Sequence, residues 1–312
     1  MQNSITRTNS VWKLRTQSLE LGSRTLVMGV VNITPDSFSD GGFFFDSEAA
    51  VAHGLRLLDE GADLLDLGAE STRPGTSVGT AISATHQPSK PPAVSAEAEQ
   101  ARLLPVLEGI LKVRPDAVIS IDTYKAATAR AALAAGAEVI NDVSGFTWDS
   151  EMAGICAQAG CGVVLMHTRG RPDQWSTQEK LAPDALLKFV SAGLTASLAL
   201  ARAASIAPDS IVLDPGYGFG KKYDENYSLL ARQAELLSLG RPLLAGVSRK
   251  SFLGHTLAHL YGGTPAPAGA REAASIAAMV AAILEGASIV RVHRVQPAVE
   301  AARIADALLA AR

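Results

Sequence analysis

The chain has 312 residues, 47% of them hydrophobic and 19% charged, so it can form a large buried core and global disorder is excluded. A formal net charge of −3 argues against a broad electrostatic surface for nucleic acid, so any anion site has to be built locally. Cys156 and Cys161, the two cysteines, lack the second pair that a structural zinc site needs, and we expect buried free thiols in a reducing compartment.

The sequence also argues against export and membrane insertion. Residues 1–17 contain no apolar segment of the kind found in secretory signals. The longest uncharged helix-like run, Ala273 to Leu284, is shorter than the ~18 apolar residues of a membrane span. We therefore expect a cytoplasmic protein without a membrane or nucleic-acid partner.

Residues 1–24 are expected to be an N-terminal extension, in which residues 11–21 resemble a short hairpin that covers the lower end of the next domain. From residue 25 to residue 312, short β-branched segments alternate with alanine- and leucine-rich helical patterns. The expected strands are Leu26–Asn32, Asp63–Gly68, Ala117–Asp122, Glu138–Asp142, Gly162–His167, Ile211–Asp214, Pro242–Ser248 and Ile289–His293. The expected helices are Glu48–Glu60, Ala96–Lys112, Lys125–Ala135, Ala185–Ala204, Asn226–Leu239, Arg271–Gly286 and Pro297–Ala311.

Strands that alternate with helices in this way predict parallel crossovers and the α/β fold class. Eight such units in a single domain of about 250 residues are most simply a closed (β/α)8 TIM barrel. An open doubly wound sheet is the alternative. Residues 76–95 interrupt the pattern, because they are rich in Ser, Thr, Pro and Ala, and they predict a long mobile loop after the second strand. Ser95 is then expected to cap the next helix, with Glu97 and Glu99 in its first turn.

Nearly every expected strand ends in a polar or charged side chain. In a (β/α)8 barrel the carboxyl ends of the strands form the active face. Helix capping explains one or two such residues, and Asp142 could be one of them, but it does not explain eight strands. The strand-end residues in chain order are Asn32, Asp66, Asp122, Asn141, Asp142, His167, Asp214, Ser248 to Lys250, Arg291 and His293.

These residues fall into two chemical groups. Asp122, Asn141 and Asp214 suit a flat heterocycle with several N–H donors, because hydrogen bonds to a carboxylate contribute about 1.5–3 kcal/mol each. Phosphate or carboxylate is the expected partner of a cationic group made of Arg73, Lys250, Arg291 and His293. A substrate with a donor-rich ring at one end and a phosphate at the other fits both groups.

Three weaker patterns have ordinary explanations. The glycines of residues 214–221 match neither a dinucleotide fingerprint nor a Walker A motif, and we expect them to let a ligand approach the backbone, with Phe219 as an apolar face. His255 and His259 have the spacing of a helical metal pair, but the Glu of that motif is missing, so surface or packing roles are favoured. Ser248 is no hydrolase nucleophile, because Lys250 stands where a G-x-S-x-G elbow around Ser248 would need its second Gly.

Seven segments, in register with the expected strand ends, carry a family resemblance. They are VVNITPDSFSDGG (30–42), DLGAESTRPG (66–75), SIDT (120–123), VINDVSG (139–145), DPGYGFGK (214–221), GVSRKSFLG (246–254) and IVRVHRV (289–295). From about Leu26 to the C-terminus the chain resembles the dihydropteroate synthase family. The resemblance implies a homodimeric TIM-barrel transferase of folate biosynthesis and a sulfonamide target. It would join 6-hydroxymethyl-7,8-dihydropterin diphosphate to p-aminobenzoate, giving 7,8-dihydropteroate and diphosphate.

The resemblance also implies roles for individual residues. Asn32 would be the ligand of a Mg²⁺ cofactor carried by the diphosphate. The pterin would be held by Asp122, Asn141, Asp214, Lys250 and Arg291. The diphosphate would be held by Asn32, Thr72, Arg291 and His293. The p-aminobenzoate pocket would be framed by Thr72, Arg73, Pro74, Phe219 and Ser251. The catalytic residues would be Asp36, Asp122 and Lys250.

Residues 34–42 would be a lid that brings Asp36 and Phe38 over the site, and an inert turn is the alternative. Because ring nitrogens of the dihydropterin can stabilise a cation on the exocyclic carbon, a dissociative route is expected. Residues 271–286 form a helix that is apolar on most sides, which indicates burial against a second subunit or simple barrel contact.

The chain departs from the family pattern at Ala69, where a second Gly is usual, in the segment MHTRG (166–170), and at Arg294, where an Asp is common. The insertion within residues 76–95 leaves open how Thr72 and Arg73 are presented. Three rival functions are a folate-dependent methyltransferase, a non-catalytic pterin-binding homologue, and a bifunctional enzyme that also carries the preceding pyrophosphokinase. The first would not need the anion-binding residues, the second should have lost some of them, and the third would need a second domain.

Overall fold

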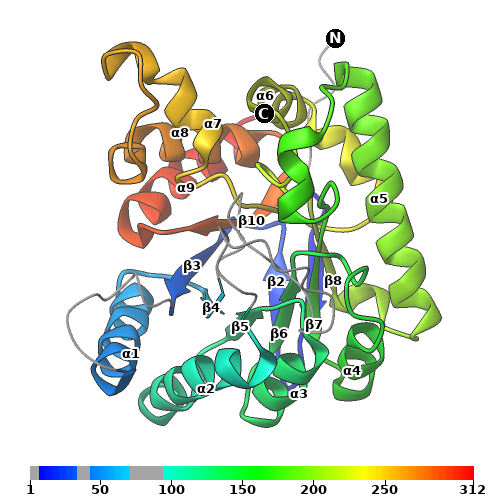
Figure 1. Cartoon of the computed structure of the whole chain (residues 1–312), viewed down its shortest axis with the longest axis vertical. Coiled ribbons are helices and arrows are strands. Elements are labelled where there is room, and N and C mark those ends of the chain that lie inside the picture. Colours follow the sequence, from blue (N-terminus) through cyan, green and yellow to red (C-terminus); the bar gives the residue numbers. More distant parts are fainter. Residues whose placement is uncertain (1–6, 34–42, 71–93) are drawn as a thin grey trace.

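The computed structural model describes residues 7–33, 43–70 and 94–312. Within these ranges eight parallel strands close into a barrel in the order β10-β3-β4-β5-β6-β7-β8-β9, with helices around it (Figure 1). The barrel strands are β3 Leu26–Asn32, β4 Leu64–Gly68, β5 Ile119–Asp122, β6 Val139–Asp142, β7 Gly162–Met166, β8 Ile211–Asp214, β9 Leu243–Ala245 and β10 Ala287–Val292. The prediction of a closed barrel is confirmed, and the open sheet is excluded.

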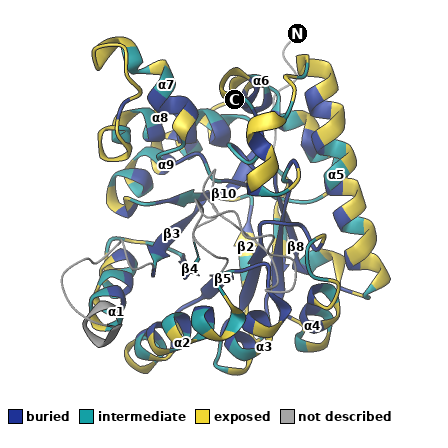
Figure 2. Cartoon of the chain, viewed as in Figure 1, coloured by how far each residue is buried: buried dark blue, intermediate teal, exposed yellow. Residues whose placement is uncertain are grey.

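The helices follow the strands and cover them from outside. They are α1 Phe43–Asp59, α2 Ala96–Val113, α3 Ala126–Ala134, α4 Met152–Ala159, α5 Pro183–Ala203, α6 Tyr223–Ala231, α7 Ser251–Thr256, α8 Glu272–Leu284 and α9 Val295–Ala310. Figure 2 shows the barrel strands buried and the outer faces of helices such as α2 and α5 exposed. This explains the near-continuous apolar strands, because parallel strands with helices packed over them are buried on both faces.

One helix differs from the sequence prediction for a physical reason, and one predicted helix cap is confirmed. The helix expected over residues 226–239 is split into α6 and the 3-10 helix η4 Gln233–Leu239. At the junction, Arg232 leaves the helical conformation (φ −124°), and the buried amide of Gln233 binds Tyr217 Oη at 2.7 Å and Ala282 O at 3.0 Å. The predicted cap of α2 is confirmed, because Ser95 Oγ accepts a hydrogen bond from the N–H of Ala98 at 3.2 Å.

By length and composition alone, α5 could cross a membrane, because an 18-residue window within its 21 residues reaches a mean hydropathy of 1.4. It is nevertheless one of the barrel helices, and Leu186, Val190 and Leu194 are buried in the main core with the barrel strands. The apolar character of α5 therefore serves packing in this fold.

A two-stranded antiparallel hairpin, β1 Ser10–Lys13 and β2 Ser18–Leu21, precedes the barrel. Its side chains Trp12, Leu14 and Leu21 join a core cluster with the inward-facing residues near the N-terminal ends of the barrel strands. Trp12 is 1% exposed, and its Nε1 donates to the carbonyl of Ser210 at 2.9 Å. The hairpin therefore closes the lower end of the barrel, as the sequence predicted.

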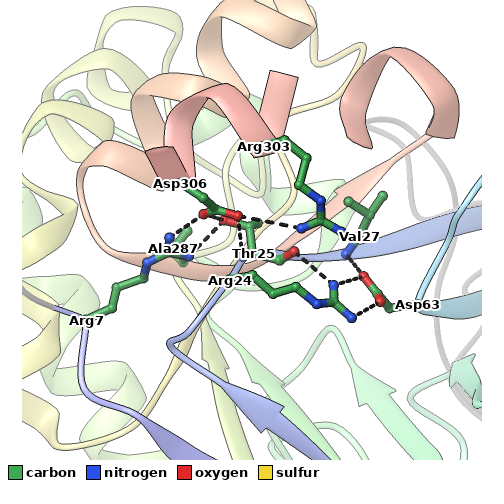
Figure 3. A network of polar contacts seen from close by, with 8 residues as sticks. All are labelled: Arg7, Arg24, Thr25, Val27, Asp63, Ala287, Arg303 and Asp306. Carbon is green, nitrogen blue, oxygen red and sulfur yellow. Dashed lines mark hydrogen bonds and ion pairs between the residues drawn. The ribbon is translucent and has the colours of Figure 1, made fainter. Parts of the chain in front are cut away.

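A network of charged groups at the same end joins the start of the chain to its last helix (Figure 3). Asp306 in α9 pairs with Arg7 and accepts from the backbone N–H of Thr25 at 2.9 Å. Beside it, Arg24 pairs with Asp63 at 2.5 Å between Nη2 and Oδ1. Because Asp306 is only 12% exposed, these contacts are worth more than surface ion pairs, and they fix where β3 enters the barrel.

Candidate active site

The floor of the site is a cluster of charged groups at the carboxyl ends of the strands. Arg291 in β10 reaches across the barrel, with Nε 2.6 Å from Asp66 Oδ2 and Nη2 2.9 Å from Asp122 Oδ2. The amide of Asn141 donates to Asp66 Oδ2 at 3.1 Å, and the hydroxyl of Ser120 donates to Asp66 Oδ1 at 2.7 Å. Strands β4, β5, β6 and β10 thus meet at one fully buried carboxylate.

The charges in this cluster are adjusted by burial and by each other. Burial raises the pKa of Asp122 to about 7, and the nearby Arg291 acts in the opposite direction. Burial also disfavours the charge on Arg291, but Asp66 and Asp122 outweigh it, so the pKa of Arg291 is raised. The guanidinium stays charged, and Asp122 is a carboxylate that can hold or release a proton near neutral pH.

A second pair lies on β8 and after β9. Asp214 is buried, and its Oδ1 accepts from the N–H of Gly216 at 2.7 Å. Burial raises the pKa of Asp214. The ammonium of Lys250 lies 4.0 Å from the centroid of the Phe219 ring, and burial lowers its pKa to about 8 while Asp214 opposes that shift. Lys250 is therefore a cation at neutral pH that has lost much of its hydration.

An apolar wall stands beside these polar groups. Tyr124, Val143 and Met166 form a buried cluster against which Trp148 and Phe219 pack. Trp148 meets Tyr124 edge to face, with ring centroids 5.1 Å apart. The sequence indicated Phe219 as an apolar face and Met166 as core or pocket wall, but it indicated no role for Tyr124, Val143 and Trp148. A flat wall next to carboxylates and an amide suits a heteroaromatic ring.

The remaining strand ends provide groups for an anion. Ser248 Oγ lies 2.9 Å from His293 Nδ1, just beyond β9 and β10. Asn32 ends β3 beside Gly68 of β4. Ser251 is the exposed first residue of α7, directly after Lys250.

Two of the strand-end residues serve the protein scaffold instead. Asp142 caps the turn after β6, accepting from the N–H of Ser144 at 2.7 Å and of Phe146 at 2.9 Å. The ring of His167 packs edge to face on Phe189 of α5, with centroids 5.4 Å apart, and burial lowers its pKa well below 6.5. The sequence allowed a helix-capping role for Asp142, but the N–H groups that it binds belong to a turn, and α4 begins only at Met152.

Several proposed residues lie outside the part of the chain that the structure describes. They are Asp36 and the rest of residues 34–42, together with Thr72, Arg73 and Pro74. Most of the insertion at residues 76–95 lies outside it as well.

The structure explains the glycines after Asp214 differently from the sequence, which indicated that a ligand approaches the backbone there. Gly216 has φ +71°, and a Cβ there would lie 1.9 Å from the carbonyl oxygen of His167. Gly220 has φ +72°, and its Cβ would lie 2.6 Å from Cβ of Arg169. Both glycines therefore let this loop pack against the loop after β7. Close approach to protein, rather than to a ligand, explains these two positions.

The cysteines and the histidine pair agree with their sequence interpretation. Cys156 and Cys161 are buried and free. His255 stacks on Tyr223, with ring centroids 3.6 Å apart, and His259 Nδ1 lies 3.2 Å from Thr256 O. Across the described ranges, no three side chains of His, Cys, Asp or Glu are grouped so that they could hold a metal ion.

Comparisons with known proteins agree with this arrangement. The family of pterin-binding enzymes matches residues 28–293. Dihydropteroate synthase of Escherichia coli (strain K12) is 39% identical, with 95% of this chain and 95% of that protein covered. The dihydropteroate synthase of Mycobacterium leprae is 41% identical, with coverages of 91% and 93%. A crystal structure of Yersinia pestis dihydropteroate synthase with a sulfonamide drug complex superposes with a TM-score of 0.83 at 37% identity, covering 96% of this chain and 99% of that chain. The chain belongs to the pterin-binding enzyme family, among the dihydropteroate synthases of folate synthesis.

Proposed function

We propose that the chain joins 6-hydroxymethyl-7,8-dihydropterin diphosphate to p-aminobenzoate, which gives 7,8-dihydropteroate and diphosphate. The observation that carries this proposal is the division of the barrel mouth into two parts. Acids and an amide lie against an aromatic wall, and cations lie beside them. A flat ring with N–H donors and a diphosphate tail matches both parts.

The pterin ring would lie against Val143 and Met166, with its donor edge on Asp214 and Asn141. Asp214 is buried, its Oδ1 is held by Gly216, and Oδ2 remains to accept from the ring. Such charge-assisted hydrogen bonds contribute about 1.5–3 kcal/mol each, which is enough to orient a substrate of this size. Lys250 would donate to the ring from the side of Phe219, and Arg291 and Asp122 would complete the contact.

The diphosphate would leave toward His293, Arg291 and Asn32. The side-chain amide of Asn32 makes no hydrogen bond to the described residues, so its oxygen can bind a cation. One neutral protein oxygen fits a Mg²⁺ that keeps its waters and takes phosphate oxygens as further ligands, and the absence of an acidic cluster among the described residues fits the same mode. When bound, this ion would supply positive charge to the departing oxygens.

The chemistry would follow a dissociative route. As the C–O bond breaks, nitrogen lone pairs of the dihydropterin stabilise a cation on the exocyclic carbon, and Asp122 places negative charge near it. Arg291 and His293 hold the diphosphate while it departs. The aryl amine of p-aminobenzoate then attacks the carbon and loses its proton. Asp36, carried by the proposed lid, would add negative charge near the same carbon, and closure of the lid would exclude water.

The p-aminobenzoate would bind between Phe219 and Ser251, and Thr72, Arg73 and Pro74 would complete its pocket. The pocket has a partly built aromatic side, because Trp175 meets Phe219 edge to face with ring centroids 5.4 Å apart. An aromatic acid suits this combination of a ring and the nearby ammonium of Lys250.

We further propose that residues 25–312 form one domain and that the protein is a cytoplasmic homodimer. Val280 and Ile276 of α8 are only partly buried against the barrel core, so apolar surface is left on this helix. Light scattering after gel filtration should give twice the monomer mass of 32.5 kDa. A monomer at micromolar concentration would remove the dimer from the proposal.

The function is tested by measuring diphosphate release with each substrate omitted in turn. We expect release to require the pterin diphosphate, p-aminobenzoate and Mg²⁺ together, and dihydropteroate to appear in equal amount. Release that does not depend on p-aminobenzoate would contradict the proposal. Pterin binding without any release would favour a non-catalytic binding protein, and methyl transfer from a methylated folate would favour the methyltransferase.

A further inference from the structure

Lys221 is a buried cation to which the proposed reaction assigns no role. Lys221 lies in the loop after β8, and its side chain turns back beneath that loop, where it is 6% exposed. Its ammonium donates to three backbone carbonyls, those of Gly216 at 2.7 Å, His167 at 3.3 Å and Phe219 at 3.4 Å. Among the described residues no carboxylate oxygen lies within 4.0 Å of it, so carbonyl dipoles satisfy the charge.

A buried ammonium is costly unless its hydrogens are bonded, and here burial lowers the pKa of Lys221 to about 7. The compensation is geometric, because an ammonium has three donors and three carbonyls converge on it. Without a donor at this point, those three oxygens would face one another in a buried space. The side chain is thus matched to one conformation of the backbone around it.

The three carbonyls come from two different loops. His167 follows β7, whereas Gly216 and Phe219 follow β8. The same two loops are joined again by the N–H of Arg169, which donates to the carbonyl of Phe219 at 3.3 Å. A buried ion pair between Arg169 and Glu225 of α6, 3.5 Å from Nη1 to Oε1, adds a third connection. Lys221 therefore stands at the centre of a joint between the β7 and β8 loops.

The joint fixes one side chain that faces the site. The carbonyl of Phe219 is held both by Lys221 and by Arg169, and its ring is fixed between the edge of Trp175 and the ammonium of Lys250. The carbonyl and the ring share one Cα, so a shift of the held backbone moves the ring. The Lys250 ammonium, 4.0 Å away, would lose its aromatic partner at the same time.

We propose that Lys221 is a positioning residue that holds Phe219 in place for p-aminobenzoate, through backbone carbonyls rather than through substrate contact. This inference rests on the proposed function, in which Phe219 lines the p-aminobenzoate pocket. The effect should differ between the two substrates. The pterin groups Asp122 and Asn141 lie on other strands, whereas Asp214 and Lys250 adjoin the joint through Gly216 and Phe219.

The test compares Lys221→Met with wild type in steady-state kinetics. Met keeps the length and apolar stem but has no donor. We expect the KM for p-aminobenzoate to rise about tenfold, which corresponds to loss of about 1.4 kcal/mol of orientation energy. The dissociation constant of the pterin diphosphate, measured by calorimetry without p-aminobenzoate, should rise by a smaller factor, because Asp122 and Asn141 keep their contacts. A merely structural lysine would affect both substrates alike or neither.

Two further variants keep the inference testable. Lys222→Met is the matched control, because this neighbouring lysine is partly exposed and, among the described residues, its Nζ donates to the carbonyl of Ser176 at 3.1 Å, so both constants should stay at wild-type values. If Lys221→Met does not fold, Lys221→Gln retains an amide donor and should raise the KM for p-aminobenzoate about threefold, since part of the contact survives.

A double-mutant cycle with Phe219→Ala tests whether Lys221 affects p-aminobenzoate binding through Phe219. If Lys221 acts through Phe219, its substitution adds less than about twofold to the KM for p-aminobenzoate in the Phe219→Ala background. Full additivity, or an unchanged KM in folded Lys221→Met, would overturn the inference. Wild-type protein that fails to consume p-aminobenzoate would instead overturn the proposed function, so the two failures are distinguishable.

Discussion

Asp66→Asn is the substitution that best tests how the site floor is held together. Asp66 is fully buried and accepts from Arg291 Nε at 2.6 Å, Asn141 Nδ2 at 3.1 Å and Ser120 Oγ at 2.7 Å. Asn has nearly the same volume, but it is uncharged and offers one acceptor oxygen. With that oxygen toward Arg291 and Asn141, its NH₂ group faces the Ser120 hydroxyl, which would have to turn its own hydrogen away. A hydrogen bond to a charged group contributes about 1.5–3 kcal/mol, and a buried polar group left without a partner costs about 1–3 kcal/mol.

These terms are partly offset, because Arg291 keeps its ion pair with Asp122 and its side chain is 20% exposed. We therefore expect the free energy of unfolding to fall by about 2–3 kcal/mol. Arg291 and Asn141 also lose the carboxylate that orients them, and a misplacement of about 1 Å can lower a rate about 10²-fold. The expected loss in kcat/KM for the pterin diphosphate is thus about tenfold to hundredfold.

The assay combines urea unfolding, which gives the stability, with calorimetric titration of the pterin diphosphate. Asp63→Asn is the matched control, because Asp63 lies just before the same strand at the opposite end of the barrel, where it binds Arg24 and the N–H of Val27 at 2.8 Å. The control should lose stability and keep its pterin affinity. Equal losses of stability with unchanged pterin affinity and kcat/KM in both variants would refute an orienting role for Asp66.

Three other changes have defined outcomes. Because burial lowers the pKa of Lys250 to about 8, kcat/KM should fall above pH ~8 as the ammonium loses its proton, and Lys250→Met should remove that alkaline limb from the pH–rate profile. Because the pKa of Lys250 is lower in the folded protein, the unfolded chain binds more protons between pH ~8 and ~10. The free energy of unfolding of the wild type, compared with that of Lys250→Met, should therefore rise with pH in that window. Trp12→Phe removes the hydrogen bond to the Ser210 carbonyl and should cost about 1–2 kcal/mol in urea unfolding, while pterin affinity stays at the wild-type value. Gly216→Ala would place a Cβ 1.9 Å from a carbonyl oxygen at φ +71°, so we expect more than ~1 kcal/mol of lost stability and a raised KM for p-aminobenzoate, and wild-type values of both would contradict the close packing.

The fold was predictable because its signals are local. A β-branched run that ends in a polar residue marks both a strand and its carboxyl end, so residues such as Asp122 and Asp214 could be placed on the active face in advance. The bounds of the short helices α4 and α7 were not predicted, because eight residues or fewer carry little periodicity. The break at Arg232 was missed, because it depends on where the Gln233 amide finds partners.

The site was predictable in its composition but less so in its contacts. Asp66 was recognised as a strand-end residue without a role, because its main partner, Arg291, lies 225 positions away and is brought close only by barrel closure. Likewise, the glycines after Asp214 gave no sign that they pack against the loop after β7. Asp36, Thr72, Arg73 and Pro74 lie outside the described residues, so their roles remain predictions.

The hairpin that closes the lower end of the barrel has a consequence for how the chain folds during its synthesis. Trp12 bonds to a residue 198 positions later, and Arg7 pairs with one 299 positions later. The ribosome therefore makes Arg7 and the hairpin well before their partners, so these residues have to wait unpaired until Ser210 and Asp306 have been added. Such distant closures slow folding. A tag or fusion attached before residue 1 would thus interfere with a late step of folding, the docking of the hairpin on the barrel, rather than with an early one.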